Sequence, residues 1–222
     1  MIRQAASPNH DHRPAGQAVD MLLLHYTGMP TAAAAVARLC DPAAKVSAHY
    51  LVDEDGAVLS LVDEDRRAWH AGIARWAGAD DINGLSIGVE LVNPGHEFGY
   101  RAFPPAQMAA LVDLCRDIIG RHPIPPHRVL GHADVAPARR QDPGELFDWS
   151  VLAAAGVGLW PPDGCPIGDA AADLADLGYD LAGADLGECV TAFQRHWRPG
   201  RLDGRLDDDC LGRLSWLLDR IA

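Results

Sequence analysis

The chain has 222 residues, of which 48% are hydrophobic and 23% charged, a composition typical of a globular protein and not of a disordered one. Lys and Arg total 19 against 31 Asp and Glu, which gives a net charge of −12. This balance argues against a nucleic-acid-binding protein, because phosphate contacts need a basic face. No apolar run approaches the ~20 residues of a membrane-spanning helix, and the N-terminal residues do not resemble a secretory signal.

The five cysteines are scattered along the chain, and no two have the Cys-x-x-Cys spacing. We interpret them as free thiols packed in apolar surroundings. Free thiols together with the missing signal favour the cytoplasm, with the periplasm as the alternative. The sequence does not indicate an oligomeric state.

Strands alternate with helices over the first two thirds of the chain. Short apolar runs and turn residues predict strands at 20–26, 48–52, 57–62, 85–92 and 129–132. Helical spacing of apolar residues predicts helices at 32–40, 104–119 and 149–155. This order predicts an α/β fold, with a mixed central β-sheet flanked by helices.

The last third of the chain has a different pattern. Residues 156–162 are rich in Gly and Pro, which is typical of a linker. Beyond them, apolar positions predict three short helices joined by Gly and Asp turns. We therefore predict two domains, 1–158 and a small three-helix domain over 163–222.

Three residues of metal-binding types follow predicted strands or lie in a loop. His25 and His132 each end an apolar strand, and Asp142 follows in a loop rich in Pro and Gly. Sheets of this class place ligand sites at the carboxyl ends of their strands. Two imidazoles and one carboxylate form a typical catalytic zinc set, which leaves the fourth position open. Either histidine alone would suggest a core residue with satisfied hydrogen bonds, whereas the three together predict a zinc site.

Two further residues are candidates for the chemistry. Glu90 stands in the apolar run Ser86-Ile-Gly-Val-Glu-Leu, where a carboxylate is costly unless it is paired or functional. It is a candidate general base and acid, with a structural salt bridge as the alternative. Arg140 precedes Asp142 by two residues and is a candidate for holding a developing oxyanion, with a solvated surface arginine as the alternative.

Five residues are candidates for lining a substrate pocket: Tyr26, Lys45, His49, Trp69 and His70. Lys45 is the single lysine of the chain, and His49 is also a candidate for supporting a metal ligand through a hydrogen bond. The aromatic residues among the five could equally belong to the core.

The segments that carry these residues are Leu-Leu-His25-Tyr-Thr, Ser-Ala-His49-Tyr-Leu, Ala-Trp69-His70-Ala-Gly, Gly-Val-Glu90-Leu and Gly131-His-Ala-Asp-Val-Ala-Pro-Ala-Arg-Arg140-Gln-Asp142-Pro-Gly. Together they resemble the AmpD-like zinc-dependent N-acetylmuramoyl-L-alanine amidases, whose fold is shared with certain phage lysozymes and peptidoglycan recognition proteins. The resemblance covers roughly residues 7–155.

The resemblance implies one Zn²⁺ per chain on His25, His132 and Asp142, with Glu90 as the catalytic carboxylate. It implies hydrolysis of the amide between N-acetylmuramic acid and L-alanine, in the peptidoglycan sacculus or in released (anhydro)muropeptides. The family commonly has Lys at the position of Arg140, so the departure leaves the role of this residue open.

The last 60 residues resemble the three-helix peptidoglycan-binding domain found beside such amidases. A competing function is a peptidoglycan-binding or recognition protein without catalysis. Such a protein would be expected to lack part of the ligand set, Asp142 above all. A zinc amidohydrolase with a substrate outside the cell wall is a second alternative, and only the C-terminal region argues against it.

Overall fold

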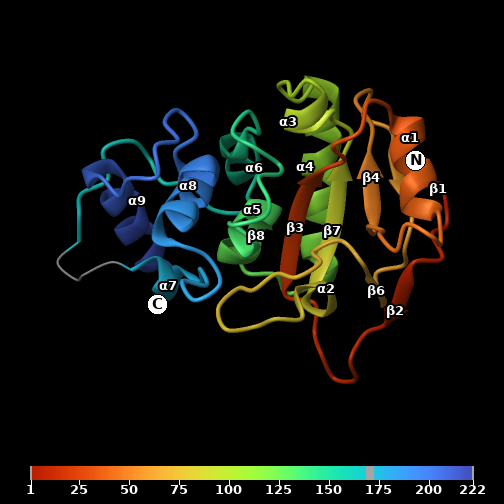
Figure 1. The fold of residues 1–222 in the computed structure, drawn as a ribbon, viewed down its shortest axis with the longest axis horizontal. Helices are drawn as coiled ribbons and strands as arrows, with labels where there is room; N and C mark the ends of the chain where they lie inside the picture. The colour runs from red at the N-terminus through yellow and green to blue at the C-terminus, as the bar shows by residue number, and fades with distance from the viewer. Residues whose placement is uncertain (1, 169–172, 222) are drawn as a thin grey trace.

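Six strands form one mixed sheet in the computed structural model, which describes residues 2–168 and 173–221 (Figure 1). Across the sheet the order is β1 (Arg3–Gln4), β5 (Val58–Ser60), β4 (Tyr50–Val52), β7 (Ser86–Leu91), β3 (Met21–Tyr26) and β8 (Val129–Gly131). β4, β7, β3 and β8 run parallel, and β5 is antiparallel to β4. The expected mixed sheet is confirmed.

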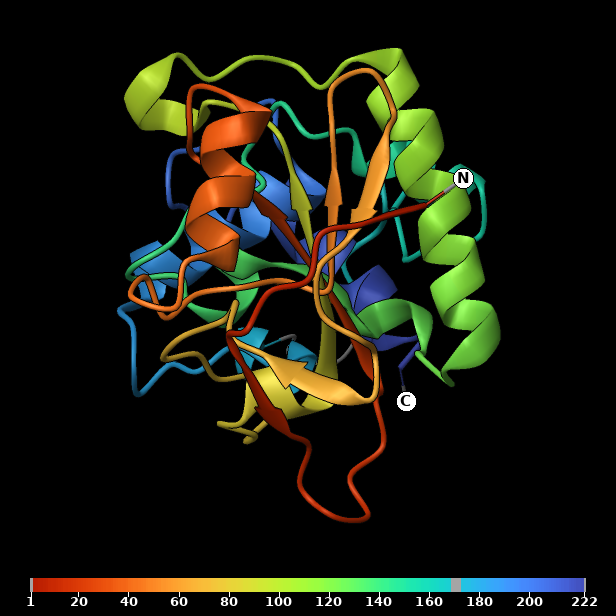
Figure 2. The same ribbon diagram turned by 90° about the vertical axis from the view of Figure 1, so that its right-hand side faces the viewer.

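Two helices cover opposite faces of this sheet, as Figure 2 shows from the side. α1 (Ala32–Cys40) begins where the sequence predicts, because the Thr31 hydroxyl accepts a hydrogen bond from the Ala34 amide at 3.2 Å. α4 (Pro105–Arg121) has a proline at its first position, where no amide hydrogen is needed. Within the described part of the chain, none of the helices is long and apolar enough to cross a bilayer.

The remaining elements are mostly short. They are the antiparallel pair β2 (His10–His12) and β6 (Arg66–Ala68), a 3-10 turn (Pro126–Arg128), and the helices α2 (Ile82–Leu85), α3 (Gly95–Phe98), α5 (His132–Val135), α6 (Trp149–Ala154), α7 (Leu174–Leu177), α8 (Leu186–Trp197) and α9 (Asp208–Leu218). α7, α8 and α9 lie in the region where three helices are predicted. Residues 169–172 and 222 of that region lie outside the described residues.

Near their carboxyl ends, the central strands carry apolar side chains on one face and polar candidate residues on the other. Side chains alternate between the two faces of a strand. Leu22 and Leu24 of β3 therefore pack in the core beneath α4 with Leu111. His25 of β3 and its register partner Glu90 of β7 lie on the opposite face. The alternation thus places the candidate catalytic residues on the side covered by α1.

One apolar cluster joins the sheet to the C-terminal helices. It contains Leu23 and Leu130 from the strands together with Phe193 and Leu214 from α8 and α9. The segment 156–162 has no helix or strand, as predicted for a linker, but its side chains pack into the cores on both sides. The C-terminal helices are therefore docked against the sheet.

Candidate active site

Parallel strands bring the candidate residues to one edge of the sheet. His25 is the penultimate residue of β3 and pairs in register with Glu90, the penultimate residue of β7. β8 ends at Gly131, and His132 opens α5 immediately afterwards. Because β3, β7 and β8 are parallel, these three residues share a carboxyl-terminal edge, as the sequence predicts.

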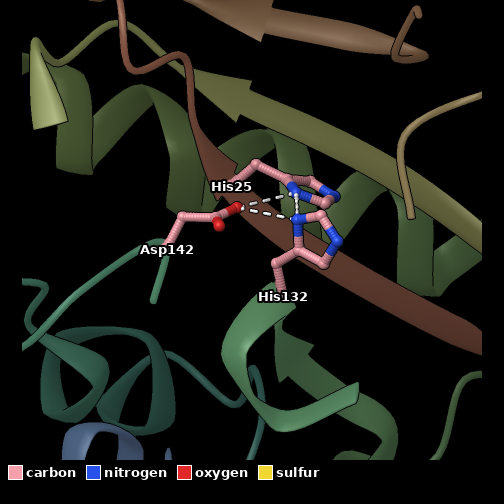
Figure 3. Close-up of side chains that lie close together, drawn as sticks. All are labelled: His25, His132 and Asp142. Atoms are coloured by element: carbon pink, nitrogen blue, oxygen red, sulfur yellow. Dashed lines mark hydrogen bonds and ion pairs between the residues drawn. The ribbon is translucent and has the colours of Figure 1, made fainter. Parts of the chain in front are cut away.

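His25, His132 and Asp142 converge on one point (Figure 3). Nδ1 of His25 lies 3.0 Å from Nδ1 of His132 and 3.0 Å from Oδ2 of Asp142, and Nδ1 of His132 lies 3.1 Å from the same oxygen. All three side chains are buried. Tetrahedral zinc with bonds of about 2.0 to 2.1 Å would hold such atoms about 3.3 Å apart. The donor set and its spacing therefore fit a zinc ion.

The far nitrogen of each imidazole is also held in place. Nε2 of His132 donates to the carbonyl oxygen of Ala71 at 2.9 Å, and Nε2 of His25 lies 3.0 Å from Nδ1 of His70. Such contacts fix the ring orientation and direct Nδ1 toward a metal. The structure thus puts His70 in the supporting position for which the sequence suggested His49.

Local sequence explains how His70 reaches His25. Its ring lies directly over Gly88 of β7, where a Cβ atom would approach the ring to 2.5 Å. The amides of His70 and Ala71 both donate to Oδ1 of Asn83, at 3.0 and 2.8 Å. A side chain larger than hydrogen at position 88 would displace the His70 ring that supports His25.

The electrostatics of the cluster suit a cation. Burial, and secondly the neighbouring His132, lowers the pKa of the His25 imidazole to about 4. Burial alone would raise the pKa of Asp142, but contacts with His132 and His25 hold it well below its usual range. A neutral imidazole and an ionised carboxylate are the protonation states that metal binding requires.

Glu90 lies beside this cluster, partly buried, and its buried carboxylate oxygen has no polar partner. Among the described residues it forms no ion pair, and its Oε2 atom has no hydrogen bond. Burial and the negative charge of Asp142 raise the pKa of Glu90 well above its usual value, while Arg140 opposes the shift. This environment favours a proton-transferring carboxyl over the structural salt bridge considered from the sequence.

A cavity of about 560 Å³ opens over the cluster. Glu90, Arg140, Tyr26, Trp69 and His70 all contribute to its lining. The Tyr26 hydroxyl lies 3.0 Å from Nδ1 of His96, a pocket residue that the sequence analysis did not single out.

Lys45 and His49 lie outside the described lining of this cavity. His49 is fully buried, and its Nδ1 atom accepts a hydrogen bond from the Gly88 amide at 2.9 Å. Two arginines that the sequence analysis missed, Arg38 of α1 and Arg139, do line it. Arg38 stands in no recognisable local pattern, and Arg139 lies within the segment around Arg140 without any sequence signal that sets it apart from its neighbour.

Residues 15–145 match the protein family described as N-acetylmuramoyl-L-alanine amidase. AmiD of Escherichia coli (strain K12), an N-acetylmuramoyl-L-alanine amidase, is 35% identical over 91% of this chain and 83% of its own length. The 1,6-anhydro-N-acetylmuramyl-L-alanine amidase AmpD of Enterobacter cloacae is 34% identical over 67% of this chain and 86% of its own.

Solved structures agree with these relatives. E. coli AmiD, in complex with anhydro-N-acetylmuramic acid-L-Ala-D-gamma-Glu-L-Lys, superposes with a TM-score of 0.82 at 35% identity, covering 93% of this chain and 92% of that one. AmpDh3 of Pseudomonas aeruginosa gives a TM-score of 0.80 at 31% identity, covering 96% of both chains. With its candidate ligand set complete and Glu90 in place, the chain belongs to the N-acetylmuramoyl-L-alanine amidase family.

Proposed function

We propose that this amidase holds one Zn²⁺ ion with His25, His132 and Asp142 and cleaves the amide between the lactyl group of N-acetylmuramic acid and L-alanine. The observation that carries the proposal is the buried triangle of ligand atoms, in which each imidazole is supported from behind. Three protein ligands leave a fourth position for substrate or water.

The ion and the residues around the triangle have separate roles in the proposed reaction. Zinc bound there supplies a Lewis acid that polarises the scissile carbonyl and lowers the pKa of water. The Glu90 carboxylate accepts a proton from the attacking water and returns it to the departing amine, and its raised pKa suits both steps. Arg140, on the wall of the same cavity, donates hydrogen bonds to the carbonyl oxygen as negative charge develops there.

The substrate class follows from the relatives and from the cavity. AmiD and AmpDh3 were each solved with an anhydromuramyl peptide. In this chain, Arg38, Arg139 and Arg140 line the cavity and supply cations for the carboxylates of a stem peptide. Released anhydromuropeptides are therefore the proposed substrates, with the sacculus as a second one.

Residues 1–158 are proposed to carry the catalysis and residues 163–222 to add affinity for polymeric peptidoglycan. Matched structures of AmiD and AmpDh3 cover more than nine tenths of this chain and so include the C-terminal region, which supports a shared arrangement. The five cysteines are all unpaired, and this supports a reducing compartment, the cytoplasm, over the periplasm. Cell fractionation with an antibody against the chain tests the compartment.

Mass spectrometry of reaction products tests the activity and the substrate together. Incubation with soluble anhydromuropeptides should release a free stem peptide beginning with L-alanine and free anhydro-N-acetylmuramic acid. The Glu90→Gln variant should release both products about 10²–10⁴-fold more slowly. Release from intact sacculi but not from soluble muropeptides would reverse the proposed order of substrates, and cleavage at another bond would contradict the function.

A further inference from the structure

A buried carboxylate ties the segment that carries His132 to the C-terminal helices. Asp134 lies within α5 and is 1% exposed. Its Oδ2 atom accepts the amide hydrogen of Gly131 at 2.8 Å and lies 2.7 Å from Nδ1 of His196 on α8. Its Oδ1 atom accepts the hydroxyl hydrogen of Tyr179 at 2.7 Å. One side chain thus joins the residue before His132 to two residues of the C-terminal region.

Both C-terminal partners are rigidly held. The His196 ring is stacked between two indoles, 3.6 Å from the centre of Trp149 and 3.7 Å from that of Trp197. The Tyr179 ring packs edge-on against Trp76 at 4.9 Å between centres. Buried, stacked partners of this kind present their hydrogen-bonding atoms to Asp134 in one orientation.

The contact between Tyr179 and Trp76 supports His132 by a second route. Trp76 belongs to the same loop as Ala71, whose carbonyl accepts the Nε2 hydrogen of His132. The Arg75 amide in that loop donates to the carbonyl of Val135 at 2.8 Å. The loop behind His132 is therefore packed between α5 and the C-terminal helices.

α5 needs such support because it is only four residues long. A single helical turn is not stable on its own, since nucleation costs more than one hydrogen bond returns. Burial of a carboxylate also costs free energy unless its oxygen atoms accept hydrogen bonds. Asp134 meets both needs at once, and two of its three partners come from residues 45 and 62 positions further along the chain.

We propose that the C-terminal helices position the metal ligand His132 through Asp134, with Tyr179 and His196 as further positioning residues. The C-terminal region then contributes to metal binding as well as to substrate binding. The inference rests on the proposed zinc site, so its test includes one measurement that needs no metal.

The first measurement is the zinc dissociation constant of the full chain, determined by competition with a chromophoric chelator well below the unfolding temperature. Asp134→Asn should weaken zinc binding roughly 10- to 100-fold, the usual effect of changing a group that orients a ligand. Tyr179→Phe removes one hydrogen bond to Asp134 and should weaken it roughly threefold to tenfold.

Tyr50→Phe is the matched control. It also removes a hydroxyl that donates to a carboxylate, Oε1 of Glu64 at 2.8 Å, but on β4. Leu214→Ala controls for destabilised C-terminal helices, because Leu214 is buried in α9 and is not a partner of Asp134. Both controls should bind zinc within about twofold of the parent, since neither removes a hydrogen bond to Asp134.

The second measurement is amide hydrogen exchange of residues 131–136 in the metal-free chain. Asp134→Asn and Tyr179→Phe should speed this exchange roughly threefold to tenfold, and Tyr50→Phe should leave it unchanged. A parent chain that binds no zinc would refute the proposed zinc site but not this inference, because amide exchange in the metal-free chain still measures how firmly α5 is held. Unchanged exchange in both test variants, or equal zinc weakening in Leu214→Ala and Tyr179→Phe, would overturn the inference.

Discussion

The two faces of β3 and β7 are made of alternating residues from the same strands, yet they differ in almost every physical property. The face beneath α4 carries Leu22, Leu24 and Val89, which are apolar and pack in the core. The other face also carries apolar core residues, Met21 and Leu23, but near its carboxyl end it carries buried His25 and partly buried Glu90, both titratable. At the carboxyl ends of the strands, a shift of one residue therefore separates side chains that stabilise the fold from the candidate catalytic side chains.

The largest effect is expected on the polar face. Glu90→Gln keeps the shape of the side chain but removes the proton acceptor, so kcat should fall by about 10²–10⁴ while zinc content and thermal stability stay close to those of the parent. Steady-state kinetics on a soluble muropeptide, with metal analysis of the same samples, checks this. Near-normal turnover would make Glu90 a structural residue.

A change on the apolar face should do the opposite. Leu111→Ala leaves a cavity between α4 and the sheet and should cost about 2 to 5 kcal/mol of unfolding free energy. At temperatures where the variant is folded, kcat should change less than twofold, since no group near the cavity is lost. Urea unfolding and kinetics on one preparation measure both. A large loss of kcat with little loss of stability would remove the distinction between the faces.

Arg140 tests whether the cavity wall takes part in the reaction. Arg140→Ala should lower kcat by about 10²–10³, the usual loss of one oxyanion donor, with little change in zinc content. The positive charge of Arg140 lowers the pKa of Glu90, so its removal should move the acid limb of the pH profile to higher pH.

Arg140→Lys is the conservative control and should retain much of the activity, since it keeps a cation at this position. Turnover of Arg140→Ala at the parental rate would show that Arg140 is a solvated loop residue. An unshifted acid limb would show that its charge does not reach Glu90.

The smallest effect is expected at Glu64, which joins the end of α4 to β4. Burial alone would raise its pKa, but hydrogen bonds from Arg121, His122 and Tyr50 lower it to about 2. Because the pKa of Glu64 is lower in the folded chain than in the unfolded chain, its ionised form stabilises the fold. This contribution is complete above the unfolded-state pKa of 4.5 and is lost as the pH falls toward 2.

Glu64→Gln should therefore be about 1 kcal/mol less stable than the parent at pH 7, and the gap should narrow below pH 4.5 and close near pH 2. Thermal unfolding of both proteins across this pH range measures the gap. A constant difference at all pH values would show that the charge of Glu64 does not contribute.

The sequence was sufficient for the long elements and for the three candidate ligands that the structure brings together. β3, α1 and α4 have clear apolar periods or caps, and their predicted positions agree with the structure to within two residues at each end. α2, α3 and α5 were missed because four residues are too few for a helical period. The candidate ligands were found because three metal-type residues stand in a recognisable pattern.

Contacts across the fold could not be predicted in the same way. His49 and His70 both stand in segments typical of the family, and the sequence does not say which ring reaches His25. The packing of His70 over Gly88 decides it. Likewise, nothing near Asp134 in the sequence indicates its partners, which lie 45 and 62 residues away.

The most direct test of the account is the zinc stoichiometry of the chain, measured by elemental mass spectrometry after metal removal and reconstitution. The parent should bind one zinc per chain, and His132→Ala should lose it while remaining folded, because two ligands from a set of three do not hold zinc tightly. Full zinc retention in folded His132→Ala would contradict the assignment of His25, His132 and Asp142 as the metal site.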